Sequence, residues 1–203
     1  MKVLVIGANN SGKGTLVKLL KEKTGLITIG CSSILDKEGL DITTGALLPD
    51  DEVNEIMKDH LSDKDNYILD GYPRTLNQDR FMKDFCVPDL IVALNISEEE
   101  VLKRAVGRRI CENCSDIYNL NGFKLPEEDG VCDKCGGKLL QREDDKEEAV
   151  KRRYYEYIEM TQPIITKYKY DDVDVLVWEF DVAEQTTEYI ADAVAGYINY
   201  VMK

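Results

Sequence analysis

The sequence predicts an α/β protein with a five-stranded parallel sheet and helices on both faces. Short apolar runs of strand length alternate with segments whose apolar residues recur at helical spacing. The intervals between these runs are too long for hairpins, so right-handed β-α-β crossovers are expected. Three of the runs end at Gly7, Asp70 and Asn95. These residues should meet at the carboxyl edge of the sheet, where such sheets bind ligands.

The expected elements follow in chain order. Strands are expected at Lys2–Gly7, Leu26–Ile29, Tyr67–Leu69, Leu90–Leu94 and Val173–Phe180. Helices are expected after a glycine loop (with Leu16, Leu19 and Leu20 on one face), at Asp51–Leu61, from Ser97 to about Val106, at Asp144–Tyr170 with a bend near Pro163, and at Thr186–Met202. Pro49 and Asp50 supply helix-start chemistry, and Ser97 with Glu100 forms a capping box.

Composition places the chain among globular proteins with one core and appendages. It has 203 residues, of which 43% are hydrophobic and 32% charged. The net charge of −13 opposes binding to nucleic acids, whose affinity depends on cationic side chains. No apolar run approaches the roughly 20 residues that cross a bilayer, so no membrane partner is expected. Met1 leads directly into the first strand without signal-peptide organisation, so a cytoplasmic location is expected.

The segment from Gly7 to Thr15 has the pattern of a phosphate loop (P-loop), because it follows a strand and opens a helix. Glycines let successive backbone N–H groups point inward, and the helix N-terminus adds partial positive charge. Lys13 is placed to reach the β- and γ-phosphate oxygens of a triphosphate. The expected ATP-binding residues of this loop are Asn10, Ser11, Gly12, Lys13, Gly14 and Thr15.

Two motifs carry a resemblance to a known family. The ending Gly12-Lys13-Gly14-Thr15, with glycine after the lysine, resembles nucleoside-monophosphate kinases. The stretch Asp70-Gly71-Tyr72-Pro73-Arg74-Thr75, followed by Gln78, resembles the signature of the adenylate kinase family. The resemblance implies that Arg74 and Gln78 hold the phosphate and base of the monophosphate. It also implies that Asp70 and Thr15 hold Mg²⁺, directly or through water.

An arginine cluster extends the resemblance. Arg104, Arg108 and Arg109 resemble the family's run before its lid, and Arg142-Glu143-Asp144-Asp145 with Arg153 resembles the segment that closes it. Arg104 would then stack on the donor adenine, and Arg108 would contact the transferring phosphoryl group. A metal ion and a ring of arginines supply most of the catalysis in phosphoryl transfer. The expected catalytic residues are Lys13, Asp70, Arg74, Arg108, Arg142 and Arg153.

Cys111, Cys114, Cys132 and Cys135 form two Cys-x-x-Cys pairs with the spacing of a four-thiolate zinc site. All ligand positions are taken, so the metal should be structural. A redox dithiol pair is the alternative. One branch of adenylate kinases carries a zinc-bearing lid here, between the two arginine segments. Cys31 and Cys86 are expected to be packing residues, and His60 a surface or core residue.

The acceptor segment departs from the family pattern. Members usually carry Ser-Thr-Gly-Asp-hydrophobic-Leu-Arg, whereas residues 30–36 read Gly-Cys-Ser-Ser-Ile-Leu-Asp. Cys31 therefore stands at the threonine position and Asp36 at the position of a phosphate-binding arginine. The stretch leading to the base-contacting turn at Gly45–Asp50 is also short, so one acceptor helix is expected to be missing. The expected AMP-binding residues are Cys31, Ala46, Leu47, Leu48, Gly71, Arg74, Gln78, Arg142 and Arg153.

These patterns define the expected organisation. A P-loop core would comprise residues 1–29, 50–109 and 139–203, with a small acceptor lobe at 30–49 and an inserted zinc lid at 110–138. The resemblance implies transfer of phosphoryl from ATP to AMP giving two ADP, with Mg²⁺ on the nucleotide and a structural Zn²⁺. Other or relaxed base specificity is one alternative, and a nucleotide-binding switch with a zinc-ribbon interaction module is another. Monomer and homo-oligomer both remain open.

Overall fold

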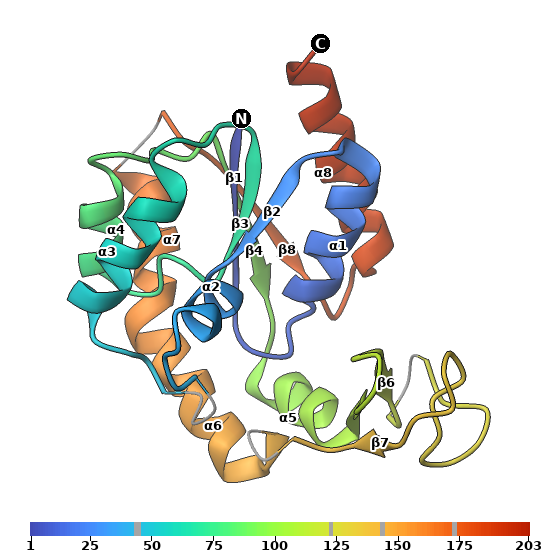
Figure 1. Ribbon diagram of the computed structural model, residues 1–203. Helices are drawn as coiled ribbons and strands as arrows, with labels where there is room; N and C mark the ends of the chain where they lie inside the picture. Colours follow the sequence, from blue (N-terminus) through green and yellow to red (C-terminus); the bar gives the residue numbers. More distant parts are fainter. Residues whose placement is uncertain (43–45, 122–123, 143–144, 172–173) are drawn as a thin grey trace.

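The structure, a computed structural model, describes residues 1–42, 46–121, 124–142, 145–171 and 174–203. Gly45, Glu143, Asp144 and Val173, which belong to sequence-based expectations, lie outside the described residues. A five-stranded sheet forms the centre of the molecule, and a three-stranded sheet extends from one end of it (Figure 1).

The central sheet confirms the predicted α/β class. Its strands are β1 (Lys2–Gly7), β2 (Ile27–Gly30), β3 (Tyr67–Asp70), β4 (Leu90–Asn95) and β8 (Leu176–Asp181). The order is β2-β3-β1-β4-β8, and every pairing is parallel. The register pairs Gly30 with Asp70 and Gly7 with Leu94, so the strands end together at one edge. That edge faces the small sheet (Figure 1).

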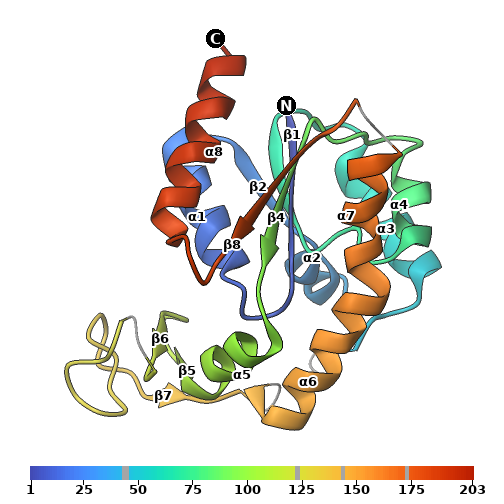
Figure 2. The same cartoon turned by 180° about the vertical axis from the view of Figure 1, so that it is seen from behind.

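Helices cover both faces of the central sheet (Figures 1 and 2). One face is covered by α1 (Lys13–Thr24) and α8 (Thr187–Val201). The other is covered by α3 (Asp50–Leu61), α4 (Leu76–Met82) and α7 (Gln162–Tyr170). Leu16, Leu20, Ile190 and Val194 are buried on the first face, and Met57, Leu61, Met82 and Ile164 on the second. The short helix α4 was not predicted; Thr75 caps it by accepting a hydrogen bond from the Gln78 backbone N–H at 3.0 Å.

The acceptor segment contains a seven-residue helix, α2 (Cys31–Lys37). Cys31 and Cys86 are both buried, as expected, and the Cys86 Sγ lies 2.9 Å from the Tyr67 hydroxyl. His60 lies on α3, where Nδ1 is 2.9 Å from the Ile56 carbonyl oxygen. Among the helices in the described ranges, none is long and apolar enough to span a membrane.

The segment predicted as one helix ending at Tyr170 is divided into three parts. These are α6 (Glu147–Glu156), a π-helical turn at Tyr157–Thr161, and α7. The irregular turn lies before Pro163 instead of at it. Proline has no N–H to donate to the carbonyl four residues earlier, that of Glu159, and its ring crowds that carbonyl, so the preceding turn widens.

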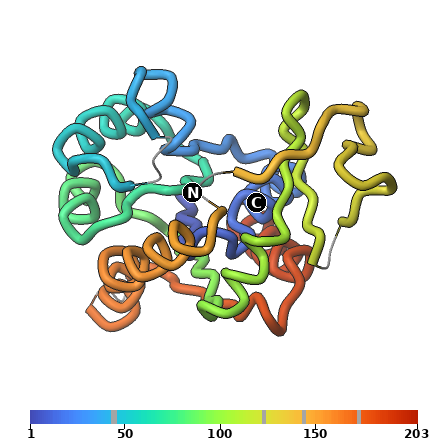
Figure 3. Tube along the Cα trace, turned by 90° about the horizontal axis from the view of Figure 1, so that it is seen from below, coloured from blue at the N-terminus to red at the C-terminus, as the bar shows by residue number. Residues whose placement is uncertain are grey.

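The small sheet is antiparallel and was not predicted as strands. It consists of β5 (Arg108–Cys111), β6 (Ile117–Asn119) and β7 (Leu139–Leu140), in the order β6-β5-β7. It follows directly on α5 (Glu98–Gly107), whose N-cap Ser97 accepts from the Glu100 N–H as predicted. Viewed from below, this part of the chain projects to one side of the core (Figure 3).

Candidate functional site

The phosphate loop joins β1 to α1, as the sequence predicts. Positive φ angles at Asn10 (62°) and Gly12 (98°) turn the backbone so that it curls ahead of the helix. The Lys13 ammonium folds back over the loop and donates to the carbonyl oxygens of Gly7 (2.6 Å) and Ala8 (2.8 Å). In this arrangement the Lys13 ammonium is hydrogen-bonded to backbone carbonyls of its own loop.

The environment of Lys13 favours its neutral form. Burial is the largest cause and lowers the pKa of Lys13 from its ordinary 10.5 to about 8. Asp70 opposes this shift, and the cations Arg74, Arg153 and Arg108 add to it. An anion placed among these groups would raise the pKa of the Lys13 ammonium again, so the site is suited to a phosphate.

A cleft of about 770 Å³ opens at the carboxyl edge of the central sheet. Many of the predicted site residues line it: Asn10, Gly12, Lys13, Gly14, Thr15, Asp70, Gly71, Arg74, Arg104, Arg108, Arg142 and Arg153. Ser11 does not, because its side chain is buried in the loop. The structure therefore gathers the phosphate loop, the acidic residue and all five predicted site arginines around one space.

Sequence reasoning missed two larger parts of this cleft and also four single lining residues, Asn9, Gly30, Ser32 and Ser33. The loop Val182–Glu188 lines the end beyond Arg104, and Ile117 and Asn119 of β6 line the side formed by the small sheet. The loop follows the last strand, so the rule that ligands bind at the carboxyl ends of parallel strands could have found it. No local pattern marks Ile117 or Asn119.

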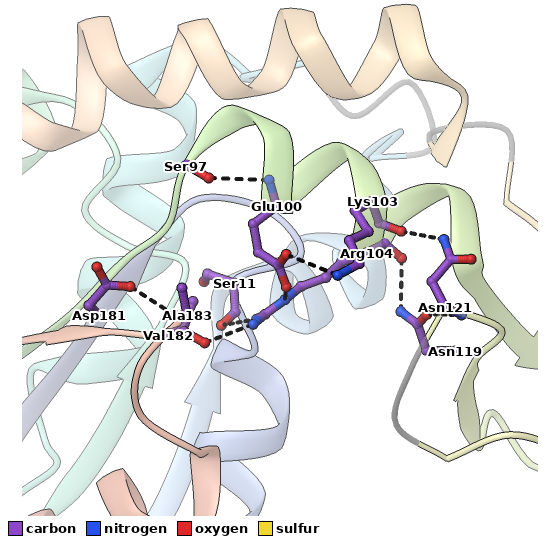
Figure 4. A network of polar contacts seen from close by, with 10 residues as sticks. All are labelled: Ser11, Ser97, Glu100, Lys103, Arg104, Asn119, Asn121, Asp181, Val182 and Ala183. Atoms are coloured by element: carbon purple, nitrogen blue, oxygen red, sulfur yellow. Dashed lines mark hydrogen bonds and ion pairs between the residues drawn. The ribbon is translucent and has the colours of Figure 1, made fainter.

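Arg104 connects the phosphate loop to the loop after β8 (Figure 4). Its guanidinium donates to the carbonyl oxygens of Ser11 (3.4 Å) and Val182 (2.9 Å) and to the Glu100 carboxylate (2.8 Å). Its own carbonyl accepts from the Asn119 side chain at 3.0 Å. These contacts fix Arg104 between the phosphate loop, the loop after β8 and β6, and its stacking on a donor base stays a prediction.

Arg108 lines the cleft, but its guanidinium is bound to Asp145. Nε and Nη2 donate to the two carboxylate oxygens at 2.7 and 2.6 Å. Arg109 instead donates to the backbone carbonyls of Val106 (2.9 Å) and Arg108 (2.8 Å). Of these two neighbouring arginines, Arg108 lines the cleft and Arg109 does not.

A smaller cavity of about 50 Å³ lies beside the cleft. Leu47, Gly71, Arg74, Arg153 and Thr161 are among the residues that line it. The Arg74 guanidinium donates to the Gly71 carbonyl at 2.9 Å and reaches the Ser32 hydroxyl at 3.4 Å. Its carbonyl accepts from Thr161 Oγ1 at 2.7 Å. Both ends of Arg74 are therefore held in place at the border of the two spaces.

Other predicted acceptor residues do not line either space. Gln78 is buried; its Oε1 accepts from the Arg74 N–H at 2.7 Å, and its Nε2 donates to Asp50 at 2.8 Å. Cys31 is buried behind Gly71, and Leu48 packs against the core. Ala46 and Asp36 are exposed. A role in binding the monophosphate stays a prediction for all the residues expected to bind it, including Leu47, Gly71, Arg74, Arg142 and Arg153, which line one or both spaces.

The donor sets present fit the two metals that the family resemblance implies. Asp70 and Thr15 offer hard oxygen atoms in the same cleft, which suits Mg²⁺. The four Sγ atoms of Cys111, Cys114, Cys132 and Cys135 lie within 4.8 Å of one another. Two of the pairs are separated by 3.4 and 3.6 Å. Tetrahedral zinc with bonds of about 2.3 Å needs sulfurs about 3.8 Å apart, so the cluster is compatible with zinc.

Comparisons with known proteins agree with this site. A family model described as "Adenylate kinase" matches residues 5–173. The chain is 37% identical to an adenylate kinase of Haloarcula marismortui over 212 residues, covering 97% of each chain. It is 34% identical to one of Petrotoga mobilis over 213 residues (97% and 99% covered) and 42% identical to one of Thermotoga petrophila over 186 residues (82% and 84% covered). The chain therefore belongs to the adenylate kinase family.

Proposed function

We propose that this protein is a phosphotransferase that moves the γ-phosphoryl group of ATP reversibly onto AMP, giving two ADP. One observation carries the proposal: Lys13, Arg74 and Arg153 line both the large cleft and the smaller cavity beside it. A donor in the cleft and an acceptor whose phosphate group reaches the cavity, which is too small for a whole nucleotide, would then meet at three cations. Cations at that point neutralise the charge on the oxygens of the group in transit.

The residues suggest how the two nucleotides are held. The triphosphate would lie on the backbone N–H groups of the phosphate loop, with the base in the part of the cleft that Arg104 and residues 182–188 line. Lys13 would leave the carbonyls of Gly7 and Ala8 to contact β- and γ-phosphate oxygens. An acceptor phosphate oxygen, oriented by Arg74, then bonds to the γ-phosphorus as the bond to the β–γ bridging oxygen breaks. Arg108, Arg142 and Arg153 would neutralise the charge.

The proposal includes two metals with different roles. Mg²⁺ held by Asp70 and Thr15, directly or through water, would neutralise phosphate charge when bound. Zn²⁺ would be structural, because four thiolates leave no open coordination position. We propose that the zinc-bearing segment 110–138 is a lid on a core of residues 1–29, 50–109 and 139–203, with 30–49 as the acceptor lobe. A four-thiolate metal site at this spacing fits a reducing, cytoplasmic location.

The experiment that tests the reaction class is a single-turnover measurement with ATP, AMP and Mg²⁺. Appearance of ADP supports phosphoryl transfer. Nucleotide binding without any ADP supports the alternative of a nucleotide-binding switch with a zinc-ribbon interaction module. The convergence of Lys13, Asp70 and Arg74 on one cleft favours the enzyme.

Acceptor identity is a separate part of the proposal. Asp36 replaces an arginine of the family pattern, and the side-chain amide of Gln78 is engaged by Asp50 and the Arg74 backbone. These two observations support a second candidate, a kinase with other or relaxed base choice. A coupled assay with AMP, GMP, CMP and UMP separates the candidates.

A further inference from the structure

Asn9 lies in the phosphate loop where the two spaces of the site meet. The residues that line both the cleft and the smaller cavity are Asn9, Lys13, Gly71, Arg74 and Arg153. Three of these side chains are cations, and Gly71 has none. Asn9 is therefore the one uncharged hydrogen-bonding side chain at this junction among the described residues.

The turn that carries Asn9 does not need an asparagine at that position. The Ser11 N–H donates to the Ala8 carbonyl at 3.3 Å, which closes a four-residue turn with Asn9 and Asn10 at its centre. Asn10 has a φ of 62°, and Asn9 is not among the residues with positive φ. This is the pattern of a type II turn, which favours proline first and glycine or asparagine second. The geometry thus explains Asn10 but not Asn9.

The carboxamide of Asn9 makes no hydrogen bond to any described residue, although its neighbours in the site do. Lys13 is held by two loop carbonyls, and Arg74 by Gly71 and Ser32. A polar side chain that the turn does not require, and that binds nothing in the protein, is available to a ligand at the junction.

We propose that Asn9 is a catalytic residue whose Nδ2 donates to a non-bridging oxygen of the phosphoryl group in transit. The inference rests on the proposed function. In the step, a bond forms between the acceptor oxygen and the γ-phosphorus, and the bond to the β–γ bridging oxygen breaks. The leaving electron pair stays on the ADP oxygen. Asn9 transfers no proton and stays neutral throughout.

A neutral donor suits this position for an electrostatic reason. Arg74, Arg153 and Arg108 already lower the pKa of Lys13, and a fourth cation beside them would lower it further. A carboxamide adds a hydrogen bond to the phosphoryl oxygens without adding charge, so it stabilises the transition state while Lys13 keeps its proton.

The test uses three variants of the full chain. Asn9→Ala removes the donor. Asn9→Pro also removes the donor and introduces proline, the residue that this turn favours most at its first central position. Asn9→Asp replaces the carboxamide with a carboxylate of similar shape. Asn199→Ala is the matched control, because that side chain is exposed on α8 and donates only to the Lys23 carbonyl. The readouts are the single-turnover rate with ATP and AMP, the Kd of ATP by calorimetry, and the Tm.

We expect Asn9→Ala and Asn9→Pro to slow the single-turnover rate about ten- to a hundred-fold, as for loss of one charge-assisted hydrogen bond. Their Kd for ATP should stay within about three-fold of wild type and their Tm within about 2 °C. Asn9→Asp should be slower still, because its charge repels the phosphates. Asn199→Ala should match wild type.

A turnover rate within three-fold of wild type in either the alanine or the proline variant would overturn the role of Asn9. So would a rate loss matched by an equal loss of ATP affinity, since that indicates ground-state binding alone. Failure of the proposed function looks different, because the wild-type chain itself would then produce no ADP in the same assay.

Discussion

Arg108 and Asp145 form a two-point ion pair between residues 37 positions apart. The pair joins the first strand of the small sheet to the segment just before α6. The Asp145 side chain is 1% exposed and that of Arg108 20%, so the pair is largely shielded from water. Arg108 must share or exchange this partner if it is to contact a phosphoryl group in the cleft.

We predict that Arg108→Lys reduces both stability and transfer. An ammonium cannot reproduce the planar fork that reaches both carboxylate oxygens, so one charge-assisted hydrogen bond to a buried carboxylate is lost. The free energy of unfolding should fall by about 1.5–3 kcal/mol. Chemical denaturation and steady-state kinetics measure the two effects. Arg109→Lys is the control, because Arg109 contacts only backbone carbonyls; equal effects in the two variants would contradict the prediction.

The second prediction concerns protons taken up when ATP binds. With a pKa of about 8, Lys13 is mostly neutral at pH 8.5 in the free protein. Phosphate oxygens favour the ammonium, so binding should take up about 0.7 proton at that pH, and affinity should fall as pH rises through 8. Calorimetry in buffers of different ionisation enthalpy measures the uptake. Lys13→Met should abolish it; the same uptake in the variant would exclude Lys13 as its source.

The same pKa predicts how Lys13 affects folding. The folded pKa lies below the unfolded value of 10.5, so between about pH 8 and 10.5 the unfolded chain binds more protons at this site. The free energy of unfolding therefore rises with pH in that window, and below it the buried ammonium costs stability. Lys13→Met should cripple transfer yet fold at least as stably as wild type at pH 7. A large drop in Tm would show that the lysine supports the fold.

The sequence predicted those features that have a local pattern. The alternation of apolar runs predicted the five strands, and the pattern of the glycine loop predicted that Lys13 lies at a phosphate-binding cleft. The pairing of Arg108 with Asp145, and of Gln78 with Asp50, depends on contacts between distant segments, for which no local periodicity exists. The helix α4 is short and the strands of the small sheet have two to four residues, too few for a period to show. Pro163 marked an irregular helix, but not that a π-turn precedes it.

Thr161 should position Arg74 from the π-turn. Its hydroxyl donates to the Arg74 carbonyl at 2.7 Å, and its side chain is largely buried. Thr161→Val keeps the shape and removes the donor, whereas Thr161→Ser keeps the donor. We predict that the valine variant raises the acceptor KM about three- to ten-fold with little change in the KM for ATP, and that serine restores it. Equal changes in both KM values would indicate a general loss of structure.

Zinc should stabilise the small sheet without entering the reaction. We predict that Cys111→Ser or Cys135→Ser lowers metal content and Tm while leaving measurable activity at low temperature, because the ligand set is closed to substrate. Elemental analysis, thermal denaturation and kinetics at about 10 °C measure these effects. Cys86→Ser is the control for metal content, since Cys86 belongs to the core of the central sheet and is not one of the four clustered cysteines. Complete loss of activity in a folded, zinc-free variant would contradict a structural role.

The acceptor lobe gives the last prediction. Asp36 is exposed on α2, four residues after Ser32, which lines the cleft. Residues four apart are neighbours on a helix, so an arginine at position 36 could reach the face that borders the cleft. Lacking that arginine, the wild type should bind the acceptor monophosphate weakly or select poorly among bases. Asp36→Arg should lower the acceptor KM about ten- to a hundred-fold, as for one charge-assisted hydrogen bond.

Steady-state kinetics with AMP, GMP, CMP and UMP on both proteins measure this effect. Asp59→Arg on α3 makes the same change of charge at an exposed position outside the cleft, so it controls for long-range attraction of phosphates. Molecular mass is measured in parallel, because a second subunit that covers the lobe would supply the missing contact. Tight, AMP-only kinetics in a monomeric wild type, with no gain in Asp36→Arg, would show that the acceptor site is complete without an arginine at this position.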